Sequence, residues 1–167
     1  ISEERRAGTM ELLLTSPISP SEIVIGKFLA CFILYLLLIL LTFQYPLIMS
    51  MYAEKLDMGP IMSGYIGLIL LGAAFISVGL FASSLCENQM IAAMLSFGAM
   101  LCFWVFGWAK YALDNALGEI LGQLSLFERY SEFLKGVVDS GNVIFFVVFI
   151  VLWLFMATRV VESDRWR

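Results

Sequence analysis

The chain has 167 residues, of which 61% are hydrophobic and 14% are charged, with a net charge of −4 at pH 7. Soluble domains are about 45–50% apolar and about 25% charged, so this composition excludes an ordinary soluble domain and favours a chain that lies in lipid. The acidic balance also argues against a nucleic-acid partner, which a basic surface would favour.

Two residue types limit the possible chemistry further. Histidine is absent, which removes most catalytic triads and most zinc sites from consideration. The cysteines Cys31, Cys86 and Cys102 lie in or beside apolar runs without metal-ligand spacing, and we interpret them as small apolar residues of packed helices. The first eleven residues are too charged for a signal peptide, and since the chain opens on Ile1 we expect it to be a fragment.

In chain order, residues 3–15 predict a short amphipathic helix at the membrane surface. On a helix, the apolar residues Ala7, Met10 and Leu14 fall on one face, and Glu4, Gly8, Glu11 and Thr15 fall on another. A Ser/Pro-rich break follows, and then a second helix begins. This arrangement is typical of a rigid lever, and equally of a simple amphipathic anchor.

Four stretches without a charged residue come next, each at least 19 residues long. A helix that rises about 1.5 Å per residue crosses the ~30 Å hydrocarbon layer in about 20 residues. We therefore predict an all-α, polytopic membrane helix bundle, a single domain over 1–167. Its transmembrane helices are predicted at 22–53, 60–86, 88–110 and 141–161.

Local signals mark the ends of these helices. Ser19 is the expected N-cap of the first, with Pro20 at its first position and Glu22 closing a capping box. Pro46 should kink that helix or end its regular part. The second and third helices are separated by little more than Glu87, which predicts a tight turn.

Residues 117–138, between the third and fourth spans, predict an interfacial helix on the opposite side of the membrane, or two short ones. Apolar residues recur there at spacings of three and four, and the charged residues lie off that stripe. The stripe consists of Leu124, Phe127, Tyr130, Leu134 and Val137.

The Lys/Arg distribution predicts the orientation. An even number of spans places both termini on one side, with six Lys/Arg residues against four on the other, and this favours cytoplasmic termini. The six are Arg5, Arg6, Lys27, Arg159, Arg165 and Arg167, and the four are Lys55, Lys110, Arg129 and Lys135.

Energy-coupling chemistry is missing from the chain itself. No Asp, Glu, Lys, Arg or His lies within any of the four predicted spans' uncharged stretches, whereas ion-coupled carriers need at least one such residue. A phosphate-binding G-x-x-x-x-G-K-[ST] loop is also absent. We therefore expect no enzyme activity, no bound cofactor and no metal in this chain, and any energy for transport must come from a partner.

The stretch from Glu4 to Lys27 resembles a family signature. It reads ERRAGTMELLLTSPISPSEIVIGK and is similar to the E-x-x-x-G-T-x-E-x-L-L-x-x-P-x-x-x-x-E-I-x-x-G-K pattern of ABC-2 type transporter permeases. The turn at 83–89 and the segments 126–133 and 136–139 look like the later motifs of the same family. Gliding-motility-type permeases, and their relatives in copper-maturation gene clusters, resemble the chain most.

The resemblance implies the permease subunit of an exporter, with a coupling helix that docks in a groove of a separate ATP-binding subunit. That subunit, and not this chain, is implied to bind ATP and Mg²⁺. The resemblance also implies six spans in the complete protein, of which this chain holds the last four, and a second permease copy or related permease in a bacterial cytoplasmic membrane. The residues implied to form the ATPase-coupling interface are Glu4, Arg5, Arg6, Gly8, Thr9, Glu11, Leu12, Leu13, Thr15 and Pro17. Those implied to carry the push into the first span are Glu22, Gly26 and Lys27.

Two other function classes stay open on the sequence. A non-transporting scaffold could recruit a cytoplasmic partner through the same amphipathic segment. An integral membrane enzyme acting on lipid would need clustered carboxylates, for which Glu128 and Glu132, one helical turn apart, are the candidates. A solvated charged face explains that pair better.

Overall fold

The computed structural model describes residues 1–9, 18–52, 57–112 and 116–164. Within these ranges the chain is helical and forms no strand, and four helices are long and apolar enough to cross a membrane. The predicted all-α membrane bundle is therefore confirmed. The helices are α1 (Ser2–Arg6), α3 (Pro20–Thr42), α4 (Gln44–Tyr52), α5 (Met58–Leu85), α6 (Gln89–Ala112), α7 (Ala116–Leu124), α8 (Leu126–Leu134) and α9 (Ser140–Asp164).

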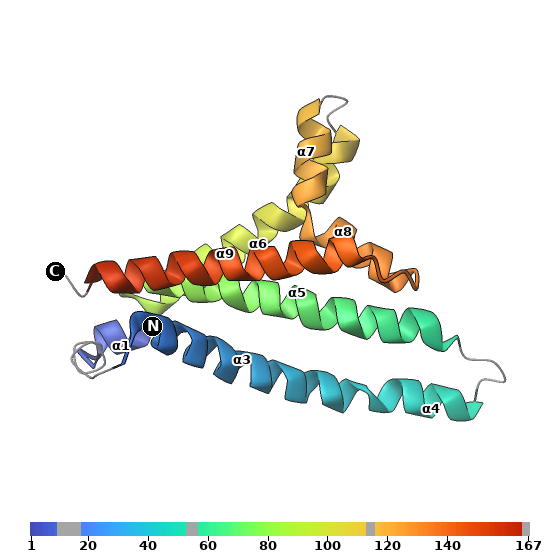
Figure 1. Ribbon diagram of the computed structural model, residues 1–167, viewed down its shortest axis with the longest axis horizontal. Coiled ribbons are helices and arrows are strands. Elements are labelled where there is room, and N and C mark those ends of the chain that lie inside the picture. The colour runs from blue at the N-terminus through green and yellow to red at the C-terminus, as the bar shows by residue number, and fades with distance from the viewer. Residues whose placement is uncertain (10–17, 53–56, 113–115, 165–167) are drawn as a thin grey trace.

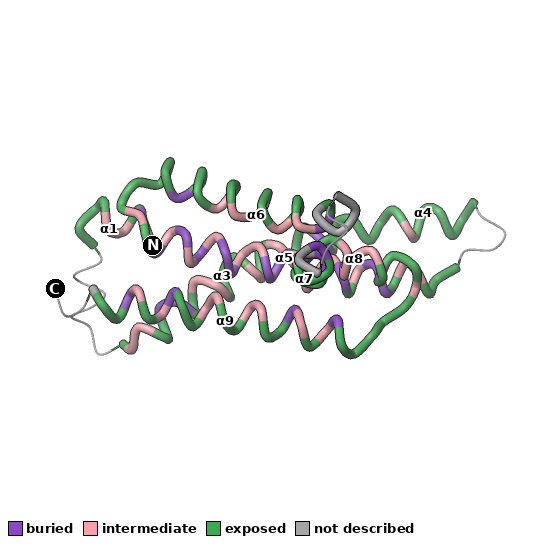
Figure 2. The backbone as a smooth tube through the Cα atoms, turned by 90° about the horizontal axis from the view of Figure 1, so that it is seen from above, coloured by how far each residue is buried: buried purple, intermediate pink, exposed green. Residues whose placement is uncertain are grey.

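The long helices run roughly along one axis (Figure 1). One end of the bundle holds α1, the start of α3, the turn from α5 to α6 and the end of α9, and we call it the α1 end. The opposite end holds α8 and the start of α9, and we call it the α8 end. The C-terminal part of α6 and the adjoining α7 stand away from the axis, and Figure 2 shows α7 nearly end-on, about halfway along the molecule.

Helix α5 is the centre of the bundle, because it packs against α3, α6, α8 and α9. Within its most apolar window 44% of the residues are buried, compared with 11–17% in the other three spans. Most of its buried residues are glycine, alanine or serine, which let neighbouring helices approach closely. The lipid-facing character of the other helices is visible in Figure 2, where exposed residues cover most of α4 and α6.

Two apolar clusters pack the helices against one another, one near each end of the bundle. At the α1 end, Val24, Leu80, Ala157 and Val161 join α3, α5 and α9. Toward the α8 end, a second cluster joins α5, α8 and α9. It consists of Ala74, Leu126, Phe133 and Phe146.

The predicted capping signals are found in the structure. The Ser19 side chain accepts a hydrogen bond from the Glu22 N–H, and the Glu22 carboxylate accepts one from the Ser19 N–H at 2.8 Å. The tight turn is also present: α5 ends at Leu85, α6 begins at Gln89, and Asn88 Oδ1 accepts from the Met90 N–H.

The first span is interrupted where Pro46 predicts a break. Helix α3 ends at Thr42 and α4 begins at Gln44. Proline has no N–H to donate to the carbonyl four residues earlier, which here belongs to Thr42. The Tyr65 hydroxyl of α5 donates to that carbonyl instead, at 3.1 Å, so the break becomes a contact between α3 and α5.

The segment predicted at 117–138 forms two short helices, α7 and α8, one of the two forms expected. Most of the predicted stripe is exposed, namely Leu124, Phe127, Leu134 and Val137. The inward side of α8 consists of Leu126 and Phe133, which are 2% and 0% exposed.

Candidate functional site

The first helix is short because glycine ends it. Gly8 has a φ of +69°, a left-handed conformation that favours glycine. The Gly8 N–H donates to the Arg5 carbonyl at 3.1 Å, and the Thr9 N–H donates to the Glu4 carbonyl at 3.0 Å. This pair of bonds is a Schellman motif, which terminates helices. The structure thus differs from the prediction of one helix over 3–15: α1 covers Ser2–Arg6, and residues 10–17 lie outside the described residues.

Two polar links attach α1 to the spanning helices. The Ser2 N–H donates to Ser83 Oγ at 3.1 Å, near the end of α5, and the Ser83 hydroxyl donates to Ser2 Oγ at 3.3 Å. The Glu4 carboxylate forms an ion pair with Lys27 Nζ of α3. Helix α1 therefore touches both the first and the second span.

The ion pair is a modest link by itself. The side chains of Lys27 and Glu4 are 27% and 31% exposed, and partly solvated pairs of this kind contribute about 0.2–1 kcal/mol. The ion pair is important for where it lies, because it joins α1 to α3 through residues that are 23 positions apart in the sequence. Gly26 and Glu22 have different roles: Gly26 is exposed, with no described atom within 4 Å of an added Cβ, and Glu22 caps α3.

The predicted site residues therefore have different positions and roles in the structure. It brings Glu4 and Lys27 together, uses Gly8 and Thr9 to end α1, and leaves Arg6 exposed on the surface. The remaining coupling residues, except Arg5, are outside the described residues; they are Glu11, Leu12, Leu13, Thr15 and Pro17. Arg5 is half-buried in α1. The sequence interpretation did not single out Ser2 or its partner Ser83 as attachment residues.

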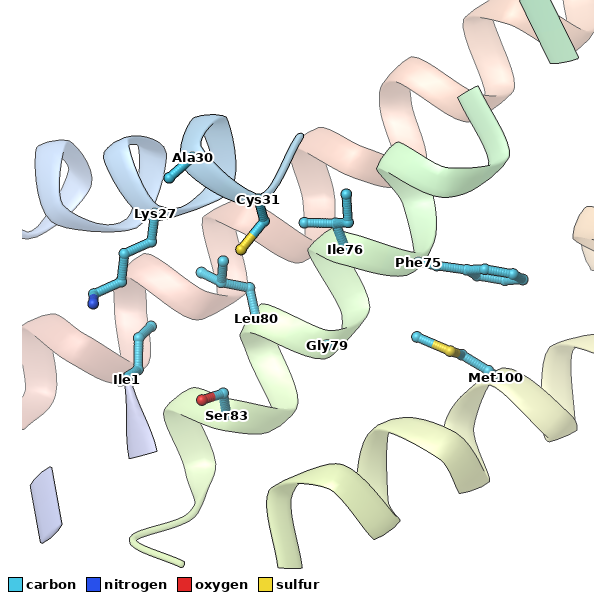
Figure 3. A pocket seen from close by; sticks show the side chains of 10 residues that line it. All are labelled: Ile1, Lys27, Ala30, Cys31, Phe75, Ile76, Gly79, Leu80, Ser83 and Met100. Atoms are coloured by element: carbon cyan, nitrogen blue, oxygen red, sulfur yellow. The ribbon is translucent and has the colours of Figure 1, made fainter. Parts of the chain in front are cut away.

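An apolar cavity of about 620 Å³ lies directly beside this attachment, between α3, α5 and α6. Figure 3 shows Lys27 and Ser83 lining it near Ile1, while Phe75 and Met100 lie farther along. The same two side chains that hold α1 therefore form one end of the cavity.

A second polar cluster fastens α8 to the start of α9. The Arg129 guanidinium donates to Asn142 Oδ1 at 2.9 Å and lies over the Phe145 ring, 4.0 Å from its centroid. The Asn142 amide donates to the Glu132 carboxylate. Asn142 is 4% exposed, so a buried amide connects the two charges. Nearby, burial raises the pKa of the Tyr130 hydroxyl, which stays neutral at physiological pH.

This cluster bears on the enzyme hypothesis. The candidate pair Glu128 and Glu132 lines a polar cavity of about 410 Å³ together with Arg129 and Asn142. Within the described residues, no group of three His, Cys, Asp or Glu side chains is placed to hold a metal ion. The Glu132 carboxylate is held by Asn142, an arrangement that fits a structural link between helices.

Comparison with known families agrees with this architecture. The family model for ABC-2 family transporter proteins matches residues 1–160. The chain belongs to this family. No curated protein and no solved structure matches it significantly. This ABC-2 chain is therefore a multi-pass membrane protein and a permease component of an ABC transporter, a transmembrane part that is not itself the ATPase.

Proposed function

We propose that this chain is the permease of an exporter driven by a separate ATP-binding subunit, which docks on α1 and the segment that follows it to Pro17. The attachment of α1 to two spans carries this proposal. A subunit that moves α1 pulls on α3 through Glu4 and Lys27, and on α5 through Ser2 and Ser83. In this proposal ATP and Mg²⁺ are bound by the partner.

The proposal includes the setting of the complex. The membrane is the cytoplasmic membrane of a bacterium. The Lys/Arg excess favours cytoplasmic termini for the chain, on the side where the ATP-binding subunit is available. A second copy of the chain, or a related permease, completes the transporter. The N-terminal motif favours the gliding-motility-type and copper-maturation-type branch of the family.

A charge-swap experiment tests the coupling role of α1. Glu4→Lys and Lys27→Glu are each introduced into the complete permease, reconstituted with its ATP-binding subunit in proteoliposomes. Each single change places two like charges together, and we expect permease-dependent ATP hydrolysis to fall about five-fold. The double variant restores the opposite charges, and we expect activity within two-fold of the wild type.

Helix α9 supplies a matched control. Arg159 and Glu162 form an exposed ion pair at 3.0 Å near the same end of the bundle, but within one helix. Reversing Arg159 to Glu should leave hydrolysis unchanged. An ATP-binding subunit that does not bind the permease contradicts the proposal. If the ATP-binding subunit binds the permease but its rate of ATP hydrolysis is the same in all of these variants, the scaffold alternative is supported instead.

A further inference from the structure

Helix α5 has a notch that receives an aromatic ring from α3. The Tyr35 ring lies so close to Gly72 that a Cβ added there would be 2.1 Å from two ring atoms. The Tyr35 hydroxyl donates to the Leu68 carbonyl, one turn earlier on α5, at 2.8 Å. Lipid supplies no hydrophobic force between helices, so close fit and hydrogen bonds hold them together. This contact has both.

A second notch on α5 receives α8. A Cβ added to Gly67 would lie 2.7 Å from the Phe133 Cβ, and the Ser63 hydroxyl donates to the Phe133 carbonyl at 2.6 Å. Phe133 is fully buried. Gly67 and Gly72 are five residues apart, so they lie about 7.5 Å apart along α5 and face different sides of it. Accordingly, α3 and α8 lie on different sides of α5 in Figure 1.

The two notches form a continuous connection between the ends of the bundle. Near the α1 end, α3 is attached to α1 through Lys27. Toward the α8 end, the same α5 backbone that holds Tyr35 also holds Phe133. Because each contact sets side-chain atoms directly against a glycine of α5, neither helix can approach α5 more closely without moving it.

We infer that α5 transmits displacement of α3 to α8 through these notches, with Tyr35 and Phe133 as positioning residues. The inference rests on the proposed function, since the partner's ATP hydrolysis supplies the displacement. Tyr35 acts by its ring, which fills the notch, and its hydroxyl fixes the ring in place. Removing the ring should therefore uncouple the two ends while the ATP site itself is untouched.

The test places a probe on α8 and changes the notch. Lys135, an exposed residue that caps α8, is replaced by cysteine in a background without the native cysteines and carries an environment-sensitive fluorophore. The complete transporter in nanodiscs is then trapped with ATP and vanadate. We expect the wild type to give a fluorescence change. Tyr35→Ala should reduce that change to less than one-fifth, and Tyr35→Phe should retain at least half.

Glycine substitutions provide a second arm and a matched control. Gly72→Ala should also abolish the response, because its methyl group displaces the ring. Combining it with Tyr35→Leu should restore at least half, since the smaller side chain leaves room for the methyl group. Gly98→Ala on α6 meets no described atom within 4 Å and should leave the response unchanged. The KM for ATP should be the same in all variants.

The outcomes separate this inference from the proposed function. If the fluorescence of the wild-type probe does not change with nucleotide and the complex does not hydrolyse ATP, the proposed function is overturned, and this inference with it. A full response in Tyr35→Ala, next to a responding wild type, overturns this inference alone. If Gly72→Ala does not fold, the comparison of Tyr35→Ala with Tyr35→Phe still tests the inference.

Discussion

Two glycine-to-alanine substitutions in the spanning helices should change stability in opposite directions. At Gly67 the new Cβ lies 2.7 Å from the Phe133 Cβ, whereas ordinary contacts begin near 3.4 Å. The helices must therefore separate by about 0.7 Å (3.4 − 2.7). Overpacking of this kind costs about 1–3 kcal/mol. At Gly98 the methyl group meets open space, and the gain in helix propensity is up to about 1 kcal/mol.

Reversible unfolding by SDS in mixed micelles, followed by tryptophan fluorescence, measures both effects. We expect Gly67→Ala to be about 1–4 kcal/mol less stable than Gly98→Ala. Adding Phe133→Ala should not remove the penalty, because alanine keeps the Cβ with which the new methyl group clashes. A Gly67→Ala variant as stable as Gly98→Ala would refute the close packing of α8 on α5.

Three further predictions concern other parts of the chain. Asn142→Leu should destabilise the fold by about 1–2 kcal/mol in the same SDS assay, because it removes two hydrogen bonds to charged partners; unchanged stability would mean that this amide is not a link. Tyr65→Phe should cost less, about 0.6 kcal/mol, since hydrogen bonds between spanning helices are weak on average, and a larger loss would show that the break at Pro46 depends on this bond. A membrane-impermeant maleimide should label Lys135→Cys in intact cells and Ser163→Cys only after permeabilisation, and the reverse pattern would contradict the cytoplasmic termini.

Local chemistry made several features predictable from the sequence. The capping box at Ser19, the break at Pro46 and the short turn after Leu85 depend on residues within a few positions of each other. The end of α1 is also local, yet the predicted helix ran through Gly8. The prediction followed the apolar periodicity of residues 3–15 and gave too little weight to Gly8, although glycine is common at helix C-termini. Gly8, followed by a polar Thr9, was the available signal.

Which helices pack against each other was harder to predict from the sequence. In water, an apolar stripe shows which face of a helix is buried, but lipid is as apolar as the bundle interior. On α3, Leu34 and Leu38 are exposed while Ile39 is buried, although all three are aliphatic. Small residues such as those of α5 allow close packing but do not identify the partner helix. That Tyr35 fits Gly72, and Phe133 fits Gly67, depends on three-dimensional shape that a single sequence does not encode in any periodicity.

The break at Pro46 has a consequence for how the protein sits in membranes of different thickness. Helix α3 has 23 residues and at about 1.5 Å per residue is long enough to span ~30 Å of hydrocarbon alone. The nine residues of α4, none of them buried, are surplus length. A continuous helix would have to tilt to hide this hydrophobic mismatch. Because the helix is broken at this point, α4 can take an angle in the bilayer different from that of α3 while α3 keeps its contacts with α5.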